Sequence, residues 1–206
     1  MTAARHGGGA PIADTAIMLS ARGLKKSFGA VVAADAVDIE VPVGQRVSLI
    51  GSNGAGKTTF VNMVTGYLKP DAGSIVLDGR QIDGLGPRRI ARLGVARSFQ
   101  IPQLALEMSA LDNMLVAAAC NDGELSFWRP ARSPARRERA MALLERFQLA
   151  EHAQRRAAEL PGGVRKLLDI AMALTGRPKL LLLDEPTSGV SVDEKFPMMD
   201  TIVAAL

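Results

Sequence analysis

Two adjacent carboxylates follow a short apolar run near the C-terminal end of the chain. Leu180 to Leu183 are four leucines, and Asp184 and Glu185 come directly after them. Four apolar residues in a row indicate a strand buried on both faces, as in a parallel sheet covered by helices. Open α/β sheets bind ligands at the carboxyl ends of their strands, so the two acids are candidates for metal and water chemistry. The alternative is that they only begin a solvated turn.

A glycine-rich segment in the first third of the chain could bind phosphate groups. Its eight residues are Gly51, Ser52, Asn53, Gly54, Ala55, Gly56, Lys57 and Thr58. They match the pattern G-x-x-x-x-G-K-(S or T), in which glycines let backbone N–H groups point at phosphate oxygens. Lys57 is expected to contact the β and γ phosphates, and the Thr58 hydroxyl is placed to ligate Mg²⁺. The other interpretation is an ordinary glycine-rich turn.

Both candidate segments have the local context that this chemistry requires. Arg46 to Ile50 is predicted to be a buried strand before the loop, and Thr58 to Tyr67 suits a helix after it. This order places the positive end of the helix dipole at the phosphates. In enzymes that hydrolyse nucleoside triphosphates with such a loop, a second buried strand ends in an aspartate that orders Mg²⁺. A further residue orients the attacking water. Asp184 and Glu185 fit these two roles.

The remaining patterns predict an α/β fold with a helical insert near residues 101–160. Met18 to Val47 is rich in β-prone pieces, and Val37 to Val41 alternates as a half-exposed antiparallel strand does. Ile75 to Leu77 resembles another short strand. Helices are predicted after the capping pair Ser109 and Asp112, over Ala135 to Leu149, after Gly162-Gly163, and at the end of the chain, where Met199, Ile202, Val203 and Leu206 share a face.

Composition narrows the classes of protein. The 206 residues are 48% apolar and 22% charged, which predicts a packed core, and aromatic residues at 4% argue against a stacking platform for single-stranded nucleic acid. The formal charge is +4, and the arginine-rich run from Arg129 to Arg139 is interpreted as a solvated face, the alternative being contact with anionic lipid or a partner. The single Cys120 fits a reducing compartment. No apolar segment approaches the roughly 18 residues needed to span a bilayer, and residues 1–17 are expected to form a flexible tail.

Several motifs in order make the chain resemble the ATP-binding subunits of ABC transporters from about Leu19 onward. The motifs are Phe28 in Lys26-Ser27-Phe28-Gly29, the Walker A loop Gly51 to Thr58, Gln100 in the Q-loop, Leu160 to Val164 in place of the signature, and Walker B with its glutamate at Leu180 to Glu185. The resemblance implies a P-loop ABC ATPase fold. An antiparallel N-terminal β subdomain and an inserted helical subdomain would belong to one domain, 18–206.

The resemblance also implies a role for each motif residue. Phe28 would stack on adenine, and Thr59 would join the Walker A residues around ATP. Gln100 would ligate Mg²⁺ together with Thr58 and Asp184 and would couple the site to a partner. Lys57, Gln100 and Glu185 are the implied catalytic residues. The signature residues Leu160, Pro161, Gly162, Gly163 and Val164 would contact the nucleotide that a second subunit holds.

The chain departs from the family pattern at several places. Pro161 stands where serine is usual and Val164 where glutamine is, so the signature lacks a hydroxyl for the γ-phosphate. Val190-Ser191 replaces the usual Leu-Asp, which leaves Asp193 as a doubtful stand-in for the D-loop aspartate. The sequence ends at Leu206, before the strand that carries the family's switch histidine. We therefore expect the C-terminal strands to be missing and the 206 residues alone to hydrolyse ATP slowly or not at all.

Within the family, the chain is most similar to subunits of branched-chain amino acid importers, whose relatives import urea and amides. The resemblance implies ATP and Mg²⁺ as cofactors, a second ABC ATPase subunit in a homo- or heterodimer, and transmembrane permease subunits. A substrate-binding protein would act indirectly, and no nucleic acid is expected. The chain would lie peripherally at the cytoplasmic face of the inner membrane. The alternatives are a catalytically inactive nucleotide-binding fragment and a soluble ABC ATPase that does not serve transport.

Overall fold

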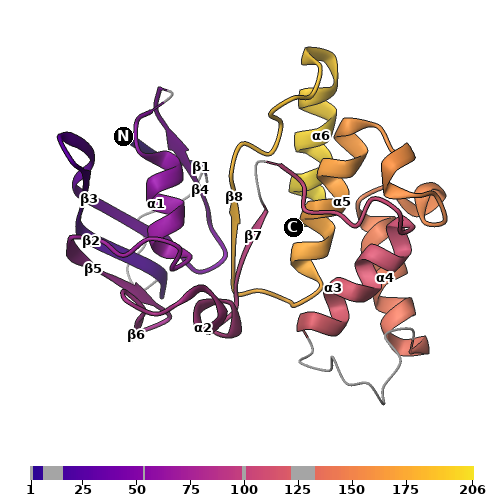
Figure 1. Ribbon diagram of the computed structural model, residues 1–206, viewed down its shortest axis with the longest axis horizontal. Helices are drawn as coiled ribbons and strands as arrows, with labels where there is room; N and C mark the ends of the chain where they lie inside the picture. The colour runs from indigo at the N-terminus through magenta and orange to yellow at the C-terminus, as the bar shows by residue number, and fades with distance from the viewer. Residues whose placement is uncertain (1, 7–15, 53, 99–100, 122–132) are drawn as a thin grey trace. The chain divides into compact units, whose positions relative to one another are not determined.

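A computed structural model describes residues 2–6, 16–52, 54–98, 101–121 and 133–206 (Figure 1). The chain divides into two compact units, Met1–Val95 and Ala96–Leu206. The first unit is mostly β-structure, and the second is mostly helical. The chain therefore contains both helices and strands, as the predicted α/β class requires, with most strands in the first unit and most helices in the second.

In the described part of the first unit, the structure has six strands and two helices. They are β1 (Thr2–His6), β2 (Ile17–Phe28), β3 (Val31–Pro42), β4 (Arg46–Ile50), α1 (Lys57–Val64), β5 (Ala72–Leu77), β6 (Arg80–Gln81) and α2 (Pro87–Arg92). A four-stranded sheet has the order β3-β2-β5-β6, and each neighbouring pair of strands in it is antiparallel. The antiparallel strands predicted between Met18 and Val47 and at Ile75 to Leu77 are confirmed.

The core of this sheet follows from alternation along β2. Leu19 and Ala21 are buried, as period-two spacing requires, and Leu24 is buried after a shift in register. Gly23, with φ of 58°, lies inside this irregularity. A β-bulge of this kind adds a residue to one strand, so it returns Leu24 to the buried face. Ile75 and Leu77 of the neighbouring strand β5 are buried as well.

Strand β4 differs from the sequence prediction in its surroundings. It forms at Arg46–Ile50 as expected, but exposed and half-buried residues alternate along it, and Ile50 is 57% exposed. The predicted complete burial is therefore wrong. Its neighbour is β1, which pairs with it antiparallel from Thr2↔Ile50 to His6↔Arg46. The structure thus has a strand within the tail predicted for residues 1–17, because the open edge of β4 offers backbone groups that an extended segment can pair.

In the second unit, the helices of the described residues pack around an apolar core. Its elements are α3 (Ala110–Asn121), α4 (Pro134–Arg146), the 3₁₀ helices η1 (Ala150–His152) and η2 (Ala157–Glu159), α5 (Gly162–Leu174), β8 (Leu180–Leu183) and α6 (Val192–Ala205). Strand β7 (Val95–Ser98) crosses the boundary between the units and is the neighbour of β8 in a two-stranded sheet. The largest buried side chains of the core include Met114, Leu115, Leu144, Phe147 and Leu168.

Local capping explains where two of these helices begin. The backbone N–H of Asp112 donates to Ser109 Oγ at 3.0 Å, which confirms the N-terminal cap predicted for the first helix of the insert. Ser133 Oγ accepts from the N–H of Arg136 at 3.3 Å, and Pro134 follows at the first helical position. The region predicted as a helical insert therefore contains α3, α4 and the two 3₁₀ helices.

Two predictions about side-chain environment are corrected in this unit. Helix α6 forms as predicted, but it buries Met198, Ile202 and Ala205, whereas Val203 is 40% exposed and Leu206 47% exposed. The buried face of α6 is the one that packs against the core formed by the other helices. This face differs from the one that the sequence predicted. In the arginine-rich run Arg129 to Arg139, Arg136 is buried at 3% exposure, so that run is not a uniformly solvated face.

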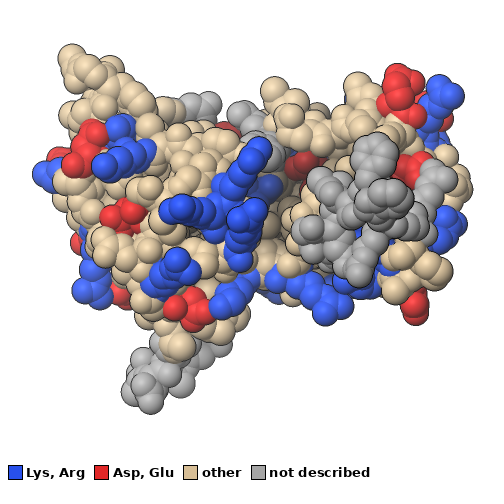
Figure 2. Space-filling model, turned by 60° about the horizontal axis from the view of Figure 1, so that its bottom comes forward, with Lys and Arg blue, Asp and Glu red and all other residues tan. Residues whose placement is uncertain are grey.

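The charged surface is mixed. On the face drawn in Figure 2, Lys and Arg side chains lie among acidic side chains and uncharged surface. Three arginines of α2, Arg88, Arg89 and Arg92, are exposed. Among the described residues, none of the helices combines the length and the apolar character that crossing a bilayer requires.

Candidate functional site

The glycine-rich loop connects β4 to α1, as its motif requires. Gly54 and Gly56 have φ of 81° and 82°, in the left-handed region that favours glycine. Gly56 is also the N-cap of α1, and a Cβ there would lie 2.1 Å from the carbonyl oxygen of Ala33. The loop conformation therefore excludes a side chain at Gly56. Asn53 of the motif lies outside the described residues.

Lys57 closes this loop on itself. Its Nζ donates to the carbonyl oxygens of Gly51 at 2.7 Å and Ser52 at 2.9 Å, so the ammonium lies against the loop backbone. Thr58, which is exposed, and Thr59 follow it in the first turn of α1. This turn carries no acidic residue, and Gly56 has no side chain to cap the free N–H groups. A positive helix end with a lysine beside it can bind a phosphate group.

Phe28 lies at the tip of the β2–β3 hairpin. It is 52% exposed and pairs across the strands with Val31, which is 65% exposed, next to Val32 at 64%. Lys26 Nζ lies 5.8 Å from the centroid of the Phe28 ring and 2.6 Å from Asp71 Oδ1. The ring thus has a free surface on which a planar base could stack. Sequence reasoning found Phe28 but missed the two valines, whose place opposite it depends on the hairpin register.

Asp184 directly follows strand β8 in the second unit. Its side chain is 7% exposed, and its Oδ2 accepts from Arg97 Nη2 of strand β7 at 2.9 Å. Burial of the strand itself is weaker than predicted, because only Leu180 is buried and the next three leucines are half-buried. The aspartate is therefore more enclosed than the strand that carries it. Arg97 was not identified as a site residue from the sequence.

A second buried carboxylate, Asp169, connects helix α5 to the end of β7. Its Oδ2 accepts from Ser98 Oγ at 2.9 Å, and its Oδ1 accepts from the backbone N–H of Gln103 at 3.1 Å. The Asp169 residue is 6% exposed. Sequence reasoning missed this link; its one signal is an acid inside the apolar pattern of the helix after Gly163. Ser98 and Gln103 lie on either side of residues 99–100, so the predicted Gln100 lies outside the described residues.

Lys166 adds a buried cation one turn before Asp169 on α5. The residue is 2% exposed. Burial lowers the pKa of its ammonium, and the nearby charges of Asp169, Asp184 and Glu185 oppose that shift. The end of β8 therefore lies in a region where two cationic side chains, Lys166 and Arg97, balance several carboxylates.

Glu185 differs from Asp184 in both exposure and backbone. The residue is exposed, and its φ of 48° is in the left-handed region, which is uncommon for a residue with a side chain. Its carbonyl oxygen accepts from the N–H of Ser188 at 3.0 Å, so Glu185 begins a tight turn. Backbone conformations of this kind concentrate at functional sites. An exposed carboxylate here is able to accept a proton from water.

The signature residues begin helix α5. Leu160 is buried at 2% exposure, Pro161 is the N-cap, and Gly162 and Gly163 form the first turn. A Cβ on Gly162 would meet none of the described residues within 4 Å, so this turn is open. Helix α5 has no acid in its first turn, and the proline side chain cannot cap its N–H groups. The helix start can therefore approach an anion through its backbone, with Val164 half-buried in the next position.

The donor chemistry of these residues fits a magnesium nucleotide. Mg²⁺ prefers oxygen ligands and uses few protein carboxylates when phosphates share it. Thr58 supplies an exposed hydroxyl and Asp184 a carboxylate, in the first and second units respectively. Among the described residues, no three His, Cys, Asp or Glu side chains group as a metal cage. A hydroxyl and a single carboxylate are the kinds of oxygen donor that Mg²⁺ takes from a protein when phosphates supply other ligands.

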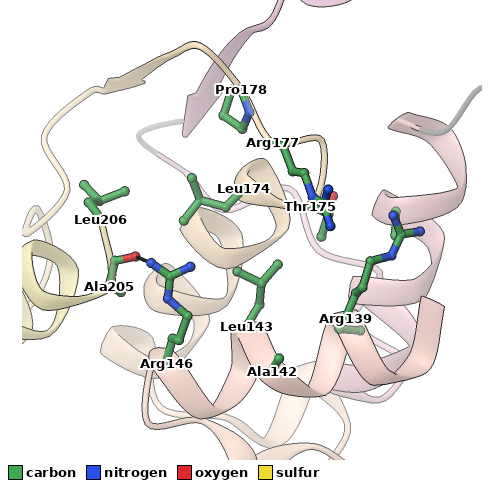
Figure 3. Close-up of a pocket in the computed structure, with 12 residues that line it drawn as sticks. Arg139, Ala142, Leu143, Arg146, Leu174, Thr175, Arg177, Pro178, Ala205 and Leu206 are labelled. Atoms are coloured by element: carbon green, nitrogen blue, oxygen red, sulfur yellow. Dashed lines mark hydrogen bonds between the residues drawn. The ribbon is translucent and has the colours of Figure 1, made fainter. Parts of the chain in front are cut away.

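A cavity of about 380 Å³ in the second unit is separate from the predicted site residues (Figure 3). Leu143 and Leu174 contribute apolar surface to it, and Arg139, Arg146 and Arg177 contribute charge. Arg146 Nη2 donates to the carbonyl oxygen of Ala205, as the dashed line in Figure 3 shows. A cation at the last carbonyls of α6 stabilises the helix end, which gives this arginine a structural role.

Comparison with known proteins identifies the family. A model of the ABC transporter family matches residues 34–188. The high-affinity branched-chain amino acid transport ATP-binding protein LivG of Escherichia coli (strain K12) is 40% identical over 197 residues, 92% of this chain and 76% of that protein. The corresponding BraF protein of Pseudomonas aeruginosa is 42% identical over 184 residues, 86% of this chain and 72% of that protein. These relatives do not favour the inactive or non-transport alternatives.

Solved structures agree with this match. The ADP conformation of MJ1267, an ATP-binding cassette of an ABC transporter, has a TM-score of 0.76 and 33% identity, and the alignment covers 92% of this chain and 75% of that one. A dimeric ATP-binding cassette, MJ0796 bound to ADP and Pi, has a TM-score of 0.74 and 25% identity, covering 90% and 81%. The fold is that of a P-loop ABC ATPase. Together with the phosphate loop, the buried Asp184 and the open start of α5, these matches show that the chain belongs to the ABC transporter family, as one of its ATP-binding proteins.

Proposed function

We propose that this chain binds ATP with Mg²⁺ and powers the import of branched-chain amino acids as the ATPase subunit of a transporter. The observation that carries the proposal is the phosphate loop, in which Lys57 and the open first turn of α1 present positive charge around glycines that allow close approach. The names of the relatives, LivG and BraF, supply the solute class. Urea and short amides are the next candidates, since the solute is selected by other subunits.

In this proposal, residues of the first unit bind the nucleotide. Lys57 would turn from the carbonyl oxygens of Gly51 and Ser52 to the β and γ phosphates, where charge-assisted hydrogen bonds are stronger. The backbone N–H groups of the first turn of α1 would hold the phosphate oxygens. Phe28 would stack on the adenine ring. These contacts fix the nucleotide without any change in its chemistry.

Hydrolysis would depend on the turn after β8. Asp184, Thr58 and Gln100 would hold Mg²⁺, which supplies charge neutralisation on the phosphates when bound. Glu185, exposed at the start of the turn, would orient a water molecule and accept its proton. Stabilisation of the transferred phosphoryl group would come from Lys57 and from the N–H groups at Gly162 and Gly163 of a second subunit. The first of these contacts is within the chain, and the second requires a partner.

The proposed assembly follows from the same residues. The open start of α5 is suited to a nucleotide held by another copy or by a related subunit, and the MJ0796 relative is a dimer. Transmembrane permease subunits would place the chain peripherally at the cytoplasmic face of the inner membrane, with a substrate-binding protein acting through them. Asp193 at the start of α6 is exposed and lies two residues after Ser191, which stands in the place of the usual D-loop aspartate.

Uptake of radiolabelled leucine tests the proposal. The chain is produced with its membrane subunits in cells that lack their own leucine importers. Uptake should require the chain, and Glu185→Gln should lower it about 100-fold or more, because the amide cannot accept the proton. Glu40→Gln is the matched control, since Glu40 only forms a surface ion pair with Arg22.

Two results would contradict the assignment. Leucine uptake that is the same with and without the chain rejects the transport role. Uptake that survives Glu185→Gln at the level of Glu40→Gln rejects the role of Glu185. Parallel assays with labelled urea and a short amide identify the solute if leucine is not taken up.

A further inference from the structure

The ion pair between Arg97 and Asp184 occupies the carboxylate proposed to hold the metal. Arg97 Nη2 lies 2.9 Å from Asp184 Oδ2, and the two side chains are 11% and 7% exposed. Because both charges are largely removed from water, each has a strong electrostatic effect on the other. Binding of a cation at Asp184 therefore changes the electrostatic environment of Arg97.

A divalent cation and a guanidinium compete for the same carboxylate. Both bind through its oxygens, and in a poorly hydrated site two positive charges a few ångströms apart repel strongly. A cation that binds at Asp184 must therefore turn Arg97 aside or weaken its contact. The free energy lost from the Arg97 contact reduces the net affinity of the cation for Asp184.

The end of strand β7 is held by contacts that do not involve the Arg97 side chain. The next residue, Ser98, is anchored to Asp169 at 2.9 Å, and Gln103 is anchored to the same carboxylate at 3.1 Å. Successive side chains of a strand point to opposite faces, so Ser98 can hold β7 while the Arg97 side chain rotates. With β7 held in this way, a change of the Arg97 rotamer would be enough to break its contact with Asp184.

A second cation limits the cost of losing the pair. Lys166 is 2% exposed on α5, and its charge interacts with those of Asp169, Asp184 and Glu185. Asp184 therefore keeps a cationic neighbour when Arg97 turns away. Arg97 and Lys166 therefore have different roles. Arg97 makes a direct hydrogen bond to Asp184 Oδ2, whereas the charge of Lys166 interacts with that of Asp184.

We propose that Arg97 is a displaceable counter-ion that sets the affinity of Asp184 for divalent cations. The proposal rests on the assignment of Asp184 as a metal ligand in the proposed function. In the form without a cation, Arg97 neutralises the buried carboxylate and positions it at the end of β8. On binding, the cation takes over that charge balance, so Arg97 acts as a positioning residue for the metal ligand.

Binding of Mn²⁺ provides a readout that does not depend on turnover. Free Mn²⁺ is measured by electron paramagnetic resonance during titration of the full chain, in the presence of a non-hydrolysable ATP analogue. Arg97→Gln should tighten Mn²⁺ binding by about 5-fold or more, within the usual range for coupled ligands. Arg97→Lys should tighten it less, because a more strongly hydrated point charge pairs less well with a carboxylate. Arg22→Gln, which removes an exposed arginine from a surface pair, should leave it unchanged.

The outcomes separate this inference from the proposed function. If Arg97→Gln does not fold, as judged by circular dichroism, Arg97→Lys decides, and Mn²⁺ affinity equal to or weaker than that of the wild type overturns the proposal. Asp184→Asn should weaken Mn²⁺ binding in both the wild-type and the Arg97→Gln backgrounds. If Asp184→Asn has no effect, Asp184 is not a metal ligand and the proposed function is wrong at that residue. If Asp184→Asn weakens binding but Arg97→Gln does not strengthen it, only the counter-ion role of Arg97 is rejected.

Discussion

Gly54 and Gly56 have nearly the same backbone conformation but different surroundings. Their φ values are 81° and 82°. A Cβ on Gly54 would meet none of the described residues within 4 Å, whereas one on Gly56 would lie 2.1 Å from the carbonyl oxygen of Ala33. The two positions therefore separate the strain of a positive φ from the steric need for close approach.

Replacing each glycine by alanine measures these two contributions. Gly54→Ala should lower the free energy of unfolding by about 1 kcal/mol, the cost of a left-handed residue with a side chain. Gly56→Ala should lower it by about 2–4 kcal/mol, because overlap with Ala33 adds to the same strain. Urea denaturation of the two variants checks the difference. Equal losses would show that Ala33 moves aside without cost and that close approach at Gly56 is not required.

Residues differ in how far the sequence alone could assign them. The phosphate loop was predictable, because its backbone conformation requires glycines at fixed spacing and its chemistry requires Lys57 beside them. Arg97 and Asp169 were not, because each acquires its role from a partner far along the chain, at Asp184 and Ser98 respectively. No local pattern reports a pairing between β7 and β8 or between β7 and α5.

Helix α5 begins with an N-cap that cannot form the usual side-chain hydrogen bond. Pro161 has N-cap dihedrals of φ −55° and ψ 155°, which serine also adopts readily. A serine hydroxyl at an N-cap accepts from a backbone N–H of the first turn. The departure of this chain from the family signature is therefore also a departure from good helix capping.

Pro161→Ser and Pro161→Ala test this point together. Both lose the ring constraint, so their difference reports the hydroxyl alone. Pro161→Ser should be about 1 kcal/mol more stable to unfolding than Pro161→Ala, as measured by urea denaturation. If the two variants unfold at the same urea concentration, the start of α5 gains nothing from a cap.

The positions of helices and strands were predicted more accurately than the burial of their side chains. Helical periodicity and caps located α3, α4 and α5, and β-prone alternation located β3, because these patterns are local. The burial of β4 and β8 was overestimated. An apolar run shows that a strand can be buried, but it does not show which other elements pack against that strand. The face of α6 was misplaced for the same reason: Met198 and Ile202 pack on a core that the other helices define. The pairing of β1 with β4 had no signal in the tail sequence.

At the scale of the whole molecule, the predicted site is divided between two compact units. The phosphate loop and Phe28 belong to the first, and Asp184, Glu185 and the signature residues belong to the second. Order along the chain made the family recognisable, because several motifs in sequence are more specific than any one of them. Each unit is therefore described by its own residues, and the chemistry that links them belongs to the proposed function.

Isothermal titration of ATP with Mg²⁺ into the full chain tests the central claim most directly. Wild type should bind ATP, and Lys57→Ala should weaken binding about tenfold or more, because charge-assisted hydrogen bonds to the phosphates are lost. Lys25→Ala, which removes a lysine from the exposed pair with Asp35, should bind as the wild type does. Absence of ATP binding by the wild type, or equal affinity of Lys57→Ala and Lys25→Ala, would contradict the assignment of Gly51 to Thr58 as the nucleotide site.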